Sequence, residues 1–302
     1  MCVNLISIVI PVFNEEQNIP ALSARLFPVL DNLKRKYEVI FINDGSKDSS
    51  LALLLQEYKA RPEIVRVIDF NANFGQHTAI MAGFKESRGS MVITLDADLQ
   101  NPPEEIPRVI ACIDEGHDVV GTIRLKRKDN VFRRTASRFT KGVMNKLTGF
   151  ALKDYGCMLR GYRRDIVDII NEAGEASTFL PALAWKFAGN PTEIEVSHSE
   201  RAAGESNYSM FRLIRLYFDL MTAFSNIPLQ LITISGMIVF GLGLIPCLFG
   251  KFSEGLMFFL AGYTVSCVGV VGEYIGRMYQ EVRKRPRYVI RKIYEGSNNA
   301  NA

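Results

Sequence analysis

The chain has 302 residues, a hydrophobic content of 48% and a modest formal net charge of +4. This length is enough for one large or two modest domains with a sizeable core. The five cysteines lack the paired spacing of a disulfide framework or a zinc site, and the three histidines are too scattered to form a metal site.

The first 122 residues alternate apolar, β-branched runs with amphipathic segments. Strands are predicted at residues 5–13, 37–43, 64–70, 91–95 and 118–122. Helices are predicted between them at residues 17–36, 49–60, 76–87 and 103–115. This alternation is typical of a mostly parallel sheet covered by helices on both faces, in which ligands bind beyond the carboxyl ends of the strands.

Polar residues follow each of the first four predicted strands. The clusters are Asn14-Glu15-Glu16, Asp44-Gly45-Ser46, residues 71–75 and residues 96–100. Each cluster alone is ordinary turn or capping chemistry. Because all four are expected at one edge of the sheet, together they predict a shared site for a polar ligand.

The fourth predicted strand ends in two carboxylates, Asp96 and Asp98, with only Ala97 between them. Residues two apart on a strand share a face, so these like charges raise each other's pKa unless a cation lies between them. Magnesium and manganese prefer oxygen ligands and commonly use one or two carboxylates plus substrate phosphates. The pattern predicts a divalent metal site at Asp96 and Asp98, with Gln100 supplying a further oxygen or orienting a water.

A basic amphipathic segment follows the fifth predicted strand. Residues 124–146 hold nine basic residues against one acid, and apolar residues recur among them at helical spacing. This pattern favours a helix on an anionic membrane surface. A solvated charged face and RNA binding are the alternatives, and the long apolar segments further along the chain favour lipid over nucleic acid.

Two long uncharged segments follow, with 31 residues at 220–250 and 18 at 255–272. Each is long enough, or nearly so, to cross a bilayer core of roughly 30 Å as a helix; a pair of buried helices in a soluble protein is the alternative. Basic residues flank the pair, so the positive-inside rule places both termini in the cytoplasm. The expected organisation is a cytoplasmic α/β domain (1–205), an amphipathic interface helix (206–226), two transmembrane helices (227–276) and a basic tail (277–302).

Several motifs resemble a known family. The segments "SIVIPVFNEEQNI", "FINDGSKDSS", "LDADLQNPPEEIP" and "DYGCMLRGYRR" resemble glycosyltransferase family two, whose members are inverting enzymes with the GT-A fold. The hairpin and "GVVGEYIGRMYQEVRKRPRYVI" resemble the polyprenyl-phosphate branch, which contains dolichyl-phosphate mannose synthase and bactoprenol glucosyltransferases. Within that branch, "NFGQHTAIMAGF" and "STFLPALA" are most similar to enzymes that transfer 4-deoxy-4-formamido-L-arabinose to undecaprenyl phosphate.

The resemblance implies a UDP-sugar donor and a divalent cation, Mg2+ or Mn2+. The family's donor-binding positions match Pro11, Phe13, Glu15, Asn43, Asp44, Gln76, Asp96 and Ala97, and its metal-binding positions match Asp96, Asp98 and Gln100. Many relatives have two acids at the Asn43-Asp44 position, so either residue is a candidate for the contact with the base. His77 is either a donor-pocket residue or a hydrogen-bonding residue at a helix start.

For the acceptor, undecaprenyl phosphate, the resemblance implies that Arg124, Arg138 and Arg201 bind the phosphate. Asp98 and Asp154 are the expected catalytic residues. A phosphate monoester with a second pKa near 6 is already largely ionised at neutral pH, so it needs positioning more than deprotonation. Asp154 is therefore either a base or a residue that orients the sugar or an arginine, and both alternatives remain open.

The expected function is inverting transfer of 4-deoxy-4-formamido-L-arabinose from a UDP-sugar to undecaprenyl phosphate. The expected setting is the bacterial inner membrane, in lipid A modification, with no nucleic-acid partner and with a homotetramer as the assembly known in the family. One alternative keeps the chemistry and uses UDP-glucose or GDP-mannose. Another is a catalytically inactive membrane tether, but such a protein is expected to have lost some of the acids that this chain keeps.

Overall fold

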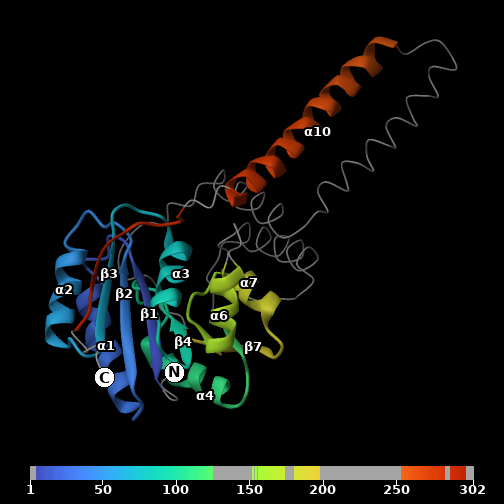
Figure 1. Cartoon of the computed structure of the whole chain (residues 1–302). Helices are drawn as coiled ribbons and strands as arrows, with labels where there is room; N and C mark the ends of the chain where they lie inside the picture. Colours follow the sequence, from blue (N-terminus) through green and yellow to red (C-terminus); the bar gives the residue numbers. More distant parts are fainter. Residues whose placement is uncertain are drawn as a thin grey trace.

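The computed structural model describes residues 5–124, 152, 154, 156–173, 180–197, 253–282 and 286–296 (Figure 1). In these residues a mixed sheet of eight strands has the order β7-β5-β6-β4-β1-β2-β3-β8. The central strands are parallel: β1 (Ile6–Val12), β2 (Tyr37–Asn43), β3 (Val65–Phe70) and β4 (Met91–Thr94). The four strands predicted here are confirmed, and their bounds agree with the predicted ones to within one or two residues.

The remaining strands extend the sheet on both sides. They are β5 (Val119–Arg124), β6 (Arg160–Arg163), β7 (Pro191–Val196) and β8 (Ile290–Tyr294). Strand β6 is antiparallel to both β4 and β5, whereas β7 is parallel to β5. The carboxyl end of β5 therefore lies beside the residues that precede β6, and this brings Arg124 to Asp154.

Helices cover both faces of the sheet (Figure 1). Apolar side chains of β1 alternate between two cores, with Ile8 and Ile10 in one and Val9 in the other. The first core includes residues of α1 (Ile19–Asn32), α2 (Ser50–Ala60) and α4 (Ile106–Asp114), which follows the short 3-10 helix η1 (Pro103–Glu105). The second includes residues of α3 (Gln76–Glu86), α6 (Arg164–Ala173) and α7 (Leu180–Phe187). Burial on both faces explains why the central strands are near-continuous apolar runs.

A 30-residue helix, α10 (Ser253–Val282), extends away from the sheet (Figure 1). Several of its large apolar side chains are exposed, among them Met257, Val268 and Val282. Within the part of the chain that the structure describes, no helix has both the length and the apolar character needed to cross a bilayer. The basic segment after Arg124, the expected interface helix at 206–226 and the first expected span lie outside the described residues.

Part of the segment 277–302, predicted as a basic tail, forms a strand of the sheet. Strand β8 pairs antiparallel with β3, with Val67 opposite Tyr294 and Ile68 opposite Ile293. The strand carries two basic residues, and an edge strand tolerates such charged side chains well. The C-terminal part of the chain therefore covers the β3 edge.

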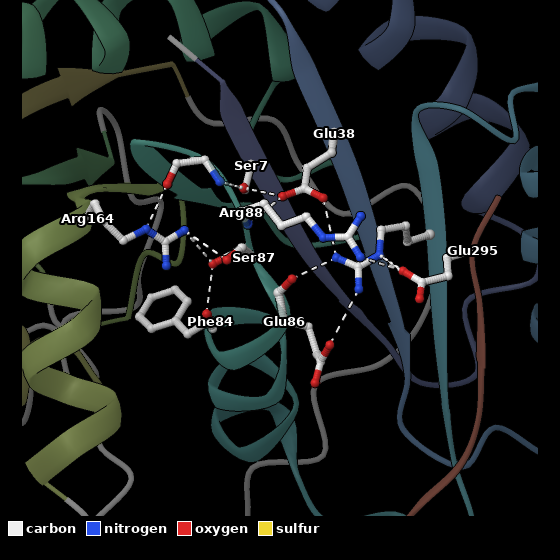
Figure 2. Close-up of polar contacts among 10 residues, drawn as sticks. Ser7, Glu38, Phe84, Glu86, Ser87, Arg88, Arg164 and Glu295 are labelled. Atoms are coloured by element: carbon white, nitrogen blue, oxygen red, sulfur yellow. Dashed lines mark hydrogen bonds and ion pairs between the residues drawn. The ribbon is translucent and has the colours of Figure 1, made fainter. Parts of the chain in front are cut away.

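A polar network is buried near the amino ends of the central strands (Figure 2). The Glu38 carboxylate accepts hydrogen bonds from the Ser7 hydroxyl at 2.6 Å and from the Arg88 backbone N–H at 2.7 Å. Buried Arg66 forms ion pairs with Glu38 at 3.4 Å, with Glu86 at 3.4 Å and with Glu295 at 3.0 Å. Since Glu295 directly follows β8, this network joins the C-terminal strand to β2 and β3.

Replacing Arg66 with alanine is expected to lower the free energy of unfolding by about 3–5 kcal/mol, because Glu38 is then left buried without its cation. Chemical denaturation of the full-length protein in detergent, followed by circular dichroism, measures the change. Arg88→Ala is the matched control, since the Arg88 side chain is half exposed in its ion pair with Glu295, and its cost is expected to stay below about 1 kcal/mol. Equal stability of the two variants would contradict the importance of the buried pair.

Candidate active site

The carboxyl ends of the four parallel strands meet at one edge of the sheet, and the polar clusters lie there. The loop after β1 contacts the loop after β2: the Asn14 side-chain oxygen accepts from the Lys47 N–H at 2.8 Å, and the Glu15 N–H donates to the Ser50 hydroxyl at 2.9 Å. Asn14 has a φ of 54°, in the left-handed region that asparagine tolerates. The convergence predicted from the sequence is therefore present in the structure.

Asp96 lies directly beyond β4 and is half-buried. Its Oδ1 accepts a hydrogen bond from the Gln76 amide at 2.5 Å, and its Oδ2 accepts one from the Asn101 amide at 3.3 Å. Burial raises the pKa of Asp96 to about 7, the Asp98 carboxylate adds to the increase, and the Arg124 guanidinium opposes it. Both hydrogen-bonding partners are neutral amides, so they fix the carboxylate in place without balancing its charge.

Asp98 shapes the turn that follows. Its Oδ1 accepts a hydrogen bond from the Gln100 backbone N–H at 3.1 Å, and Leu99 between them has a φ of 61°. A non-glycine residue in this left-handed region carries backbone strain, which is often found at functional sites. The turn keeps Asp98 close enough to raise the pKa of the Asp96 carboxyl.

The two carboxylates fit a divalent cation. Both offer hard oxygen ligands at one sheet edge, and a cation between them would remove the repulsion that raises the pKa of Asp96. No cluster of three or more metal-binding acids, histidines or cysteines occurs among the described residues. The other ligands would then come from substrate phosphate and water, as is common for magnesium. The contribution of the Gln100 side chain stays a prediction.

Asp44, at the end of β2, is buried and holds the loop before α3. Its Oδ1 accepts from the Phe74 N–H at 2.7 Å, and its Oδ2 accepts from the Gly75 N–H at 2.9 Å and from the Asn73 amide at 3.0 Å. Burial raises the pKa of Asp44, and the two backbone N–H groups oppose that increase. The loop leads directly to Gln76, so Asp44 helps to place the amide that binds Asp96.

The other predicted nucleotide-binding residues lie at or near the carboxyl ends of β1, β2 and β4. Asn43 is buried; its amide donates to Asp69 at 2.7 Å, and its oxygen accepts from the Ser46 N–H at 3.3 Å. Glu15 accepts a hydrogen bond from the Asn18 amide at 2.6 Å. Pro11 lies within β1, Ala97 is buried beside Asp96, and Phe13 is 43% exposed at the same edge. Contacts of these residues with a nucleotide stay predictions.

Arg124 and Asp154 form a two-pronged ion pair. The Arg124 Nε donates to Asp154 Oδ2 at 2.8 Å, and its Nη2 donates to Oδ1 at 2.9 Å. The side chains are only 12% and 8% exposed. The Gly156 N–H also donates to Oδ1 at 2.9 Å, and a Cβ at Gly156 would lie 2.8 Å from Arg124 Nη2, so glycine leaves room for the pair. This geometry is that of a carboxylate orienting an arginine. Arg138 and Arg201 lie outside the described residues.

The sequence did not predict two buried residues that hold Asp96 and the Asp154 segment in place. Buried Asn101 binds Asp96 through its amide, while its oxygen accepts from the Cys157 thiol at 3.2 Å. The buried Arg160 side chain donates to the backbone oxygens of Asp154 at 2.6 Å and Cys157 at 2.8 Å. Asn101 lies in a proline-rich turn and Arg160 in a basic stretch, so neither had a local signal that separated it from its neighbours.

His77 lies on the first turn of α3, next to Gln76. Burial lowers the pKa of His77 to about 4, and the Arg160 guanidinium acts in the same direction. The ring is therefore neutral at physiological pH and adds no positive charge to the site. Contact between His77 and the donor stays a prediction.

Comparisons with known proteins agree with this geometry. The family model described as glycosyl transferase family 2 matches residues 7–170. Proteins named undecaprenyl-phosphate 4-deoxy-4-formamido-L-arabinose transferase are similar over nearly the whole chain. The protein from Proteus mirabilis is 44% identical over 96% of this chain and 94% of its own length, and that from Aeromonas hydrophila is 46% identical with the same coverage.

Solved structures share the fold at much lower identity. Glucosyl-3-phosphoglycerate synthase from Mycobacterium tuberculosis, solved in complex with Mn2+ and UDP-glucose, matches with a TM-score of 0.52 and 14% identity. The match covers 73% of this chain and 77% of that one. It confirms the expected GT-A-like mixed α/β fold, and the curated relatives confirm the resemblance to polyprenyl-phosphate glycosyltransferases. The chain belongs to glycosyltransferase family 2.

Proposed function

We propose that the protein transfers 4-deoxy-4-formamido-L-arabinose from a UDP-sugar to undecaprenyl phosphate, with inversion at the anomeric carbon. The observation that carries the proposal is the arrangement at one sheet edge of a carboxylate pair, Asp96 and Asp98, near an arginine held by Asp154. Similarity over nearly the whole chain to relatives named for this reaction supports the choice of sugar and acceptor.

On the donor side, Asp96 and Asp98 would hold Mg2+ or Mn2+, and this cation, when bound, offsets charge on the leaving diphosphate. The Gln76 and Asn101 amides keep Asp96 oriented before the donor arrives. Asp44 holds the loop from which Gln76 projects. Such preorganisation removes the need to rearrange charged groups during the reaction.

On the acceptor side, Arg124 binds the lipid phosphate, since a guanidinium group matches phosphate oxygens well. A phosphate oxygen attacks the anomeric carbon, the bond from that carbon to the diphosphate breaks, and UDP leaves with the electron pair. The phosphate is already ionised near neutral pH, so no base is required. Asp154 orients Arg124 instead.

We place this reaction at the cytoplasmic face of the bacterial inner membrane. The uncharged runs at 220–250 and 255–272 and the exposed apolar side chains of α10 support an anchored enzyme whose lipid substrate lies in the bilayer. The product would supply the sugar for lipid A modification. The homotetramer known in the family remains an expectation for this chain.

Mass spectrometry of the lipid product tests the proposal. Membranes containing the protein are incubated with undecaprenyl phosphate and, in separate reactions, the UDP-linked formamido sugar, UDP-glucose and GDP-mannose. The expected product is undecaprenyl monophosphate bearing the formamido sugar. A product formed only from UDP-glucose or GDP-mannose would overturn the assigned sugar, and nucleotide binding without any lipid product would favour the inactive tether.

Replacing Asp98 with alanine is expected to reduce kcat by at least about a hundredfold, because half of the proposed cation site is lost. Calorimetric titration with Mn2+ in the presence of UDP should show weaker binding in the same variant. Asp168→Ala is the control, since Asp168 is a half-exposed carboxylate of α6 paired with Arg164. Full metal-dependent turnover by the Asp98 variant would argue against the proposed site.

The Arg124–Asp154 pair gives a test of the role of Asp154. We expect Asp154→Asn to lower kcat/KM for undecaprenyl phosphate about ten- to hundredfold, and Arg124→Ala to do at least as much. If Asp154 acts by orienting Arg124, the double variant should be no worse than Arg124→Ala alone.

A surface pair provides the matched control for that experiment. Arg163 and Asp165 form a similar but exposed ion pair, so Asp165→Asn should leave kcat/KM unchanged. Multiplicative losses in the double variant, together with loss of the acidic limb of the pH–rate profile in Asp154→Asn, would instead identify a general base.

A further inference from the structure

Strand β8 pairs with β3, and its first residues lie at the carboxyl end of that strand. Arg291 Nη1 lies 3.3 Å from Asp69 Oδ2, and its Nη2 donates to the Asn71 backbone oxygen at 3.4 Å. The Asp69 side chain is only 2% exposed, whereas that of Arg291 is 59% exposed. A cation from the C-terminal strand therefore balances a buried carboxylate at the end of β3.

The pairing of β8 with β3 is irregular at this point. Ile68 lies opposite Ile293 and Asp69 opposite Lys292, but Phe70 lies opposite Ile290, so Arg291 is passed over in the register. Extra residues of this kind redirect a side chain and are common next to active sites. The irregularity explains why Arg291, and not its neighbour Lys292, contacts Asp69.

Asp69 also binds a residue of β2. Its Oδ1 accepts a hydrogen bond from the Asn43 amide at 2.7 Å, and the Asn43 oxygen accepts from the Ser46 N–H at 3.3 Å. Asn43 immediately precedes Asp44, the residue that binds the Phe74 and Gly75 N–H groups. One buried carboxylate thus links β8 to the start of the loop after β2.

Tyr288 and Val289 contact the end of β3 and the segment that follows it, residues 71–75. The Tyr288 ring stacks on Phe70 with ring centroids 5.1 Å apart, and the Phe70 and Phe74 rings form a T-shaped pair with centroids 5.7 Å apart. The Asn71 N–H donates to the Val289 backbone oxygen at 3.1 Å. The segment 71–75 is therefore held at its start by the C-terminal segment and at its end by Asp44.

We propose that Arg291 is a positioning residue for the donor site. It fixes the segment 71–75, so that the Gln76 amide at its end meets Asp96. The C-terminal segment, through Arg291 and Tyr288, thereby helps to position the Gln76 amide, which in turn orients Asp96 before the donor binds. This inference rests on the proposed function insofar as the donor is a UDP-sugar; the effect on the loop itself does not depend on the sugar.

A purely structural role for β8 would be to cover the β3 edge, and it makes a different prediction. Edge covering changes stability without changing donor binding. Lys292 separates the two roles: it is the neighbouring cation on the same strand, and its Nζ lies 4.7 Å from the centre of the Tyr294 ring instead of at Asp69. Lys292→Ala removes the same charge and shortens a side chain at the same edge.

The experiment compares full-length wild type, Arg291→Ala, Arg291→Lys and Lys292→Ala in detergent. Hydrogen exchange is followed by mass spectrometry in peptides covering residues 70–76, and KM is measured for the UDP-sugar and for undecaprenyl phosphate. In Arg291→Ala we expect faster exchange at the Phe74 and Gly75 amides and a donor KM raised about three- to thirtyfold, with little change in the acceptor KM. Arg291→Lys should restore part of both effects, and Lys292→Ala should resemble wild type.

Two outcomes would overturn the inference. One is exchange in 70–76 and a donor KM that are the same in Arg291→Ala as in Lys292→Ala. The other is a stability loss in Arg291→Ala with an unchanged donor KM, which identifies an edge cover. Failure of the proposed function looks different: wild type would not use the UDP-sugar, while the exchange comparison, which needs no donor, would still decide whether Arg291 holds the loop.

Discussion

The candidate site depends on one carboxylate, Asp96, which neutral groups orient, without a cation, among the residues that the structure describes. Two neutral amides, from Gln76 and Asn101, bind its two oxygens. An arginine in either place would fix the carboxylate equally well but would neutralise it, and a divalent cation would then gain little by binding. Arg124, the cation that opposes the raised pKa of Asp96, already forms an ion pair with Asp154. The unbalanced charge is thereby left for a ligand.

The Glu38 carboxylate, near the amino ends of the strands, and the Asp96 carboxylate, beyond their carboxyl ends, differ in how their charge is balanced. Near the amino ends, the buried carboxylate of Glu38 is balanced by Arg66 inside the protein. At the carboxyl ends, burial and Asp98 together raise the pKa of Asp96 to about 7. Buried charge is normally paired where its role is structural, whereas a perturbed carboxyl pair marks a functional site. This contrast, within one sheet, supports the placement of the donor at the carboxyl edge.

The sequence predicted the parts of the fold that depend on local pattern. Strands buried on both faces are long apolar runs, so β1 to β4 and the Asp96–Asp98 pair were visible without a structure. Strand β6 reads Arg-Gly-Tyr-Arg and β8 carries two basic residues, so neither has such a run. The Arg124–Asp154 pair depends on β6 lying antiparallel beside β5, which is a property of strand order. The hydrogen bonds of Asp44 to Phe74 and Gly75 join two loops, and an Asp-Gly-Ser sequence predicts a turn equally well without them.

The donor half and the acceptor half of the site are framed by different parts of the chain. Arg124 and Asp154 belong to β5 and the segment before β6, whereas the loop that carries Gln76 is held by Asp44 and by β8. Between the end of α10 at Val282 and the stacked ring of Tyr288 there are only five residues. A chain of that length spans at most roughly 20 Å, so the last turn of α10 must stay near the donor loop. The donor half of the site is thus connected to α10 through the short segment before β8, whereas the acceptor half is built from β5 and the segment before β6.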